Sequence, residues 1–127
     1  MSKQDPATGP GDLRSRLRVQ LRAAIRARHR VAADSIRVAL AAIENAEAQP
    51  IETGSPAGRH PAGPAAADVP RREIGEAGAR VVVMAEIEEL RQAAAGFDRL
   101  GQHEAARRVA SQATVLEEIL ADRSAGT

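Results

Sequence analysis

Apolar residues recur at steps of three and four along two neighbouring stretches near the start of the chain. The first stretch holds Leu13, Leu17, Leu21, Ala24 and Ile25, and the second holds Ile36, Ala39, Leu40 and Ile43. This spacing places the side chains on one face of an α-helix. The polar triplet at residues 28–30 interrupts the stripe, so the sequence predicts a helical hairpin with helices at about 12–27 and 31–48. Asp12 is placed to cap the first helix.

A second helical pair is expected after a segment that opposes regular structure. Residues 49–70 contain five of the seven prolines, interleaved with glycine and alanine, which is typical of a linker. Beyond it, two further runs have heptad spacing: Val83, Ile87, Leu90, Ala94 and Phe97, then Ala106, Val109, Ala113, Leu116 and Leu120. They predict a third helix that begins at 73–76 and ends near Leu100, with Gly101 as its C-terminal glycine, and a fourth helix at about 102–120.

The predicted fold class is therefore all-α. Two helical hairpins form a small four-helix arrangement, joined by the Pro/Gly/Ala-rich linker. We expect a disordered leader at 1–11, a helical domain at 12–121 with a flexible linker at 49–70, and a disordered tail at 122–127. Phe97 is the one aromatic residue, so the core must be built from aliphatic side chains and alanine.

The composition excludes several kinds of chemistry. Without cysteine the chain has no disulfide and no thiolate metal site. His29, His60 and His103 accompany no nucleophile motif, the glutamates lack Glu-x-x-His spacing, and the glycines form no phosphate-binding loop. His29 is expected to end the first helix and His103 to open the fourth. We predict no catalytic residue, no metal site and no cofactor. The chain also lacks a signal-like leader and a run of about 20 apolar residues, which favours a cytoplasmic protein with no membrane partner.

Charge is distributed unevenly. Residues 12–30 contain seven arginines and one aspartate, whereas residues 81–98 contain four acids and one arginine. The candidate binding residues lie at four-residue steps: Arg14, Arg18, Arg22, Arg26 and Arg30. Such a stripe suits a nucleic-acid backbone or an acidic partner, and the lack of aromatic residues for base stacking favours structured RNA. The alternatives are a solvated face, a basic helix lying against an acidic one in the same fold, and a helical module for protein partners or a homodimer.

The sequence also resembles a known family. Residues 21–28, Ile36 with Arg37, and residues 40–47 resemble the opening helices of the YqeY family, which is similar to the tail of the GatB subunit of glutamyl/aspartyl-tRNA amidotransferase. The similarity resumes at Arg72-Glu73-Ile74 and continues to Leu120 through Glu86, Arg91, Phe97 and Gly101. The chain differs from the family pattern at His29, Gln102, Ile119 and Ala121, and ends before the family's usual C-terminal helical subdomain.

This resemblance implies an all-helical accessory or adaptor protein. It links the chain to carbon–nitrogen ligation with glutamine as amido-N-donor, as in the transamidation of tRNA, and makes tRNA a possible partner. It does not imply that the chain is catalytic alone, because a fold-level analogy is a weak basis for assigning an activity.

Overall fold

The structure, a computed structural model, describes residues 12–48 and 74–122. These residues form four α-helices: α1 (Leu13–Arg26), α2 (Arg30–Ala48), α4 (Gly75–Arg99) and α5 (His103–Ala121). The described ranges contain no strand, so the prediction of an all-α fold is confirmed. The predicted leader, linker and tail lie outside the described residues, apart from Asp122, which forms the C-cap of α5.

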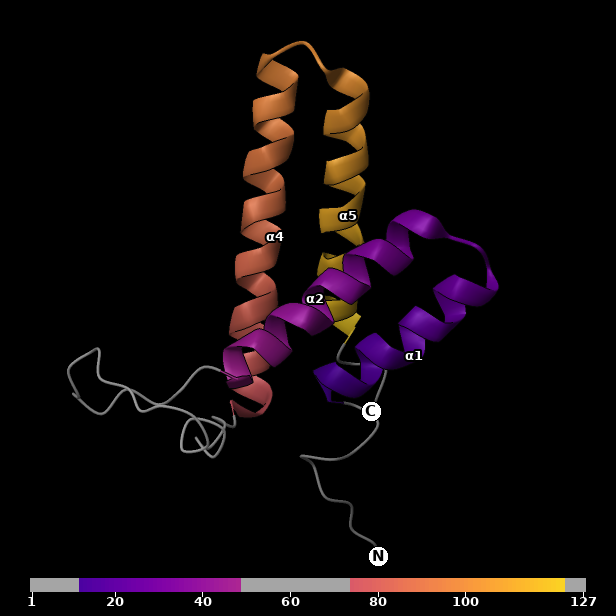
Figure 1. Cartoon of the computed structure of the whole chain (residues 1–127), viewed down its shortest axis with the longest axis vertical. Coiled ribbons are helices and arrows are strands. Elements are labelled where there is room, and N and C mark those ends of the chain that lie inside the picture. The colour runs from indigo at the N-terminus through magenta and orange to yellow at the C-terminus, as the bar shows by residue number, and fades with distance from the viewer. Residues whose placement is uncertain (1–11, 49–73, 123–127) are drawn as a thin grey trace, which may run out of the picture.

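The four helices form two antiparallel hairpins (Figure 1). Helices α4 and α5 lie side by side along the long axis of the molecule, and the α1–α2 hairpin crosses their lower half. Helix α2 contacts both α4 and α5, while α1 packs mainly on α2. The upper half of α4–α5, which leads to the turn between them, extends beyond the first hairpin.

The core lies where the two hairpins cross, and all four helices contribute to it. Its fully buried members include Leu13 and Leu17 from α1, Ile36 and Ile43 from α2, and, in the second hairpin, Val83 and Leu116. Alanines fill the space between these larger residues, notably Ala39 and Ala113, which are completely buried. The core is therefore aliphatic, as the composition predicts. Within the described ranges, no helix is both long enough and apolar enough to cross a lipid bilayer.

Burial departs from the predicted apolar faces at two positions. Ile25 was expected to face inward, but it is 49% exposed. It lies in the last turn of α1, and the contacts of α1 with α4 and α5 are few. Ile119, which lies outside the predicted seam, is buried in the core at the crossing of the hairpins. In the extended part of α4–α5 the seam residues Leu90, Ala94 and Phe97 are only half-buried.

The two hairpin turns use the same backbone geometry. In the first, the N–H of Arg28 donates to the carbonyl of Ile25 (3.1 Å) and that of His29 donates to the carbonyl of Ala24 (2.9 Å). In the second, Gly101 and Gln102 make the equivalent bonds at 3.0 and 2.8 Å. This pair of bonds is the Schellman motif, which requires a left-handed residue after the helix. Gly101 supplies it at φ 79°, as predicted, whereas the first turn has Arg28 at φ 60°.

Two carboxylates accept backbone N–H groups at the start of α1. Asp12 is the N-cap of α1, as predicted, and its Oδ1 accepts the N–H of Ser15 at 2.8 Å. Oε1 of Glu76, which lies in the first turn of α4, accepts the N–H of Leu13 at 2.9 Å. Both acids satisfy N–H groups that have no partner inside the helix and sit at the positive end of its dipole. The Glu76 contact also joins α1 to α4.

The prediction that His29 ends the first helix is wrong. Helix α1 ends at Arg26, and Nδ1 of His29 accepts the N–H of Ala32 at 3.3 Å. A side-chain acceptor three residues before the donor is the geometry of an N-cap. His29 therefore begins α2 rather than ending α1. His103 opens α5, as predicted.

Candidate functional site

Three of the five predicted binding arginines lie together on the exposed surface of α1. Arg18, Arg22 and Arg26 follow one another at four-residue steps, and each side chain is exposed. Within residues 12–48 and 74–122, none of the three forms an ion pair or a side-chain hydrogen bond. Their guanidinium groups thus remain available to an anionic partner.

Arg14 has a different role. Its guanidinium contacts the carboxylate of Glu47 through two hydrogen bonds, of 3.3 and 2.5 Å, and the side chains are 30% and 17% exposed. Two parallel N–H···O bonds to one carboxylate give a well-oriented pair. This pair ties the start of α1 to the last turn of α2, so Arg14 contributes to closing the hairpin.

The last predicted residue, Arg30, does not extend the stripe along α1. It is the first residue of α2, on the far side of the turn, and its side chain is exposed. Arg16, in contrast, is buried in α1 and adds nothing to an exposed basic face. The apolar spacing along α1 does not predict this burial, because Arg16 lies outside the stripe that Leu13, Leu17 and Leu21 define.

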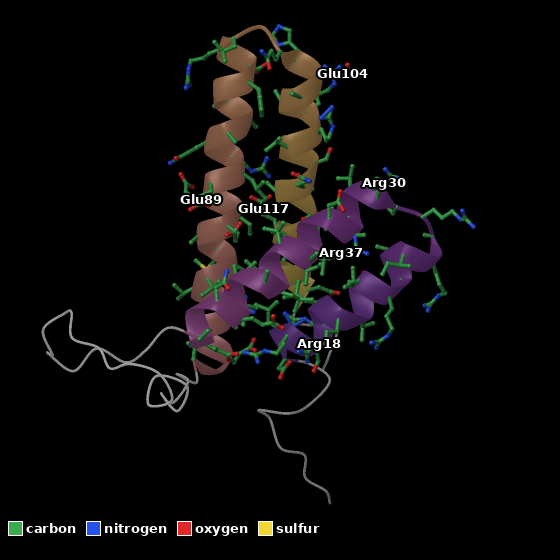
Figure 2. The ribbon with its side chains drawn as sticks, in the orientation of Figure 1. Arg18, Arg30, Arg37, Glu89, Glu104 and Glu117 are labelled. Atoms are coloured by element: carbon green, nitrogen blue, oxygen red, sulfur yellow. The ribbon has the colours of Figure 1, made fainter. Side chains whose placement is uncertain are left out.

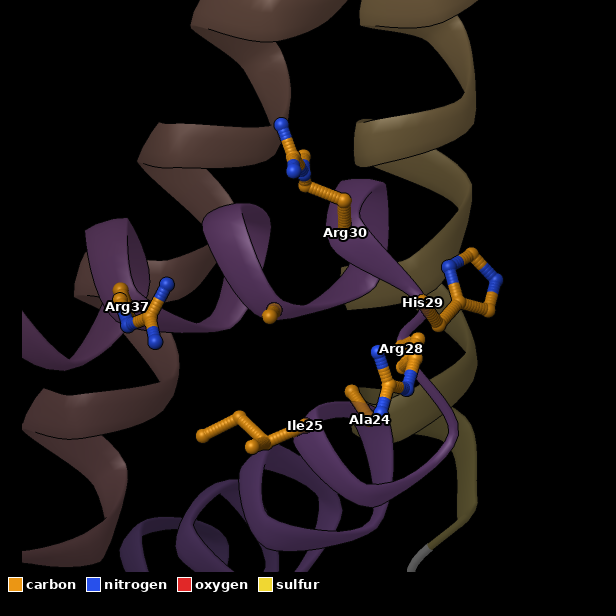
Figure 3. Close-up of a pocket in the computed structure, with 7 residues that line it drawn as sticks. Ala24, Ile25, Arg28, His29, Arg30 and Arg37 are labelled. Carbon is orange, nitrogen blue, oxygen red and sulfur yellow. The ribbon is translucent and has the colours of Figure 1, made fainter.

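The region around the turn between α1 and α2 adds cationic side chains that the four-residue spacing of arginines does not include. A pocket of about 260 Å³ lies between the end of α1 and the first half of α2. It is lined by the apolar residues Ala24, Ile25 and Ala33 and by the cations Arg28, Arg30 and Arg37. Figure 3 shows the three arginines around this pocket. The polar triplet at 28–30 is visible in the sequence, but Arg37 joins it only because α2 folds back beside α1.

The two hairpins carry opposite charge. Residues 12–48 hold eight arginines and four carboxylates, while residues 74–122 hold five arginines and nine carboxylates. In Figure 2 the labelled arginines Arg18, Arg30 and Arg37 lie on the first hairpin, and the labelled glutamates lie on the second. A charge distribution of this kind creates a potential of one sign over each half of the surface.

Little of this opposite charge is neutralised between the hairpins. The ion pairs in the second hairpin are internal: Arg91 contacts Glu117 at 2.6 Å and Arg80 contacts Glu76 at 3.6 Å. Among the described residues, Arg18, Arg22 and Arg26 make no ion pair with Glu86 or Glu89, the acids that an internal pairing of the charged faces would use. Burial, and secondarily the charge of Glu89, raises the pKa of Glu86 above its ordinary value.

The histidines and acidic side chains of the described residues do not gather into a metal site. In these ranges no group of three or more histidine and acidic side chains could hold a metal ion. His29 caps α2, and Nδ1 of His103, the first residue of α5, lies 2.5 Å from Oδ1 of Asp98 in the last turn of α4. His60 lies outside the described residues. The exposed arginines of the first hairpin are suited to binding an anionic partner through charge.

The chain matches no protein-family model, no curated protein and no solved structure. The resemblance to the YqeY family therefore stays a prediction.

Proposed function

We propose that this protein is a YqeY-like accessory or adaptor protein of the cytoplasm that binds tRNA through the phosphate backbone. The α1–α2 hairpin is the binding surface. The protein assists a tRNA-dependent amidotransferase and does not itself carry out the carbon–nitrogen ligation with glutamine as amido-N-donor. The link to this enzyme rests on the family resemblance, and the binding mode rests on the charges of the hairpin.

The observation that carries the binding mode is the set of exposed arginines on α1. Arg18, Arg22 and Arg26 have no carboxylate partner among the described residues, and their four-residue spacing aligns them along one side of the helix. Each arginine that neutralises a phosphate releases condensed counterions, so binding depends on salt. Since the described ranges have Phe97 as their one aromatic residue, the contacts that this surface offers are to the backbone rather than to stacked bases.

The test is the triple variant Arg18→Gln, Arg22→Gln, Arg26→Gln, measured with tRNA at several salt concentrations. Loss of three phosphate contacts should weaken binding and reduce the slope of log K against log salt by about 2 to 3. The matched control is Arg99→Gln, Arg107→Gln, Arg108→Gln, which removes the same charge from exposed positions of the second hairpin.

The control separates a binding surface from an effect of net charge. If both triple variants lose affinity equally, the α1 surface is not the site. If the α1 variant binds tRNA as tightly as the original protein does, the nucleic-acid function is refuted.

A second candidate is a protein-interaction module with no RNA role, either a homodimer or a partner-binding helix pair. It is favoured by Val81 and Met84, which are 63% and 54% exposed and lie three residues apart on α4. Residues at this spacing share one helix face. Light scattering over a range of concentrations, repeated with the variant Val81→Gln, Met84→Gln, tests this candidate. A dimer that dissociates in the variant supports it. A monomer at every concentration rules out the homodimer.

A further inference from the structure

The turn between α1 and α2 has an arginine at the position where the turn between α4 and α5 has a glycine. Both turns have the same pair of backbone hydrogen bonds, and both require a left-handed residue. Gly101 meets this need without strain, whereas Arg28 is the one non-glycine residue with positive φ in the described ranges. The backbone of the turn therefore does not explain why an arginine occupies position 28.

The side chain of Arg28 lines the pocket between α1 and α2. Figure 3 shows its guanidinium lying over Ala24, at the end of α1, while Arg37 approaches from α2 with Ile25 between them. Arg30 also lines the pocket, but its guanidinium extends away from Ala24 and Ile25. Two guanidinium groups thus flank the apolar residues of the pocket, one from the turn and one from α2.

We propose that this pocket binds a phosphate group between Arg28 and Arg37. Guanidinium groups present planar donor pairs that match phosphate oxygens, and their charge persists at every physiological pH. The volume, about 260 Å³, lies below the roughly 300 to 1000 Å³ of pockets that hold drug-sized ligands, which suits one small charged group. The inference rests on the proposed function in one respect, since the backbone of a bound tRNA is the expected source of the phosphate.

One carboxylate lies close enough to compete. Asp34 contacts Arg37 at 3.5 Å, and the two side chains are 53% and 57% exposed. An exposed pair at this distance is weak, because water screens both charges and the side chains lose conformational freedom on pairing. A phosphate, with more charge and more acceptor oxygens, displaces Asp34 from Arg37.

The experiment follows backbone amide resonances of the full chain during titration with inorganic phosphate and, separately, with a short RNA duplex. The test variant is Arg28→Gly with Arg37→Gln, in which glycine suits the left-handed backbone. The matched control is Arg107→Gln with Arg108→Gln, two exposed arginines of α5. We expect phosphate to shift the amides of residues 28–33, the test variant to weaken this binding about tenfold, and the control to leave it nearly unchanged.

The RNA titration distinguishes the two sources of phosphate and separates this inference from the proposed function. RNA that shifts the same amides and competes with inorganic phosphate supports a nucleic-acid source. If RNA does not bind but phosphate shifts these amides, the pocket serves a free phosphate-bearing molecule and the proposed function fails. The inference is overturned if phosphate leaves residues 28–33 unchanged or binds the test variant equally well, even where RNA binding depends on Arg18, Arg22 and Arg26.

Discussion

Replacing Arg28 by glycine should stabilise this protein. The left-handed conformation costs an ordinary residue about 1–2 kcal/mol, and glycine adopts it without that cost. Glycine also gains more freedom in the unfolded chain, which offsets about 0.4–1 kcal/mol of the benefit. Arg28 makes no ion pair with the described residues, so the change removes no such contact. The expected net gain in the free energy of unfolding is about 0.5–1 kcal/mol.

The second turn provides the reverse experiment within the same molecule. Gly101→Ala places a Cβ on a backbone at φ 79°, and no heavy atom lies within 4 Å of that Cβ. The loss therefore reports conformational strain without a steric clash. The strain costs about 1–2 kcal/mol, and the reduced freedom of the unfolded chain offsets about 0.4–1 kcal/mol of it, so the free energy of unfolding should fall by about 0.5–1 kcal/mol.

Urea unfolding followed by circular dichroism measures both changes, and thermal unfolding checks them. In a domain of this size, a change of about 1 kcal/mol corresponds to roughly 4–8 °C in Tm. Arg28→Gly should raise Tm and Gly101→Ala should lower it. If Arg28→Gly lowers stability, the arginine side chain supports the fold by more than its strain costs, and the assignment of a binding role to it loses its basis.

Two further changes test the core and the acidic hairpin. Leu17→Ala, at a completely buried position, should lower the free energy of unfolding measured in urea by about 2–5 kcal/mol. Ile25→Ala, at a half-exposed position, should lower it far less. Equal losses would contradict the observed burial of the α1 side chains. Glu86→Gln should raise Tm at pH 7. The pKa of Glu86 is raised in the folded state, so the ionisation of Glu86 destabilises the folded protein as pH rises through that pKa, and glutamine removes this charge. The gain should vanish below the ordinary glutamate pKa, where Glu86 is protonated in both states, and a gain that persists there would exclude this cause.

The sequence by itself determined the helices. Apolar steps of three and four, together with Asp12 and Gly101, place the helix ends within one or two residues of those observed. These signals are local, since a cap or a left-handed glycine acts within a single turn. The one error of this kind, at His29, arose because a polar residue between two helices can end one or begin the next.

The tertiary structure decided which side chains are available. Arg14 meets Glu47 across 33 residues, and Glu76 meets the N–H of Leu13 across 63 residues. Arg16 is buried while Arg18 is exposed, and Ile25 is uncovered while Ile119 is enclosed. None of these outcomes follows from periodicity, because exposure depends on which helix packs on which face. The same packing brings Arg37 to the pocket that Arg28 lines, so the pocket exists only in the folded hairpin.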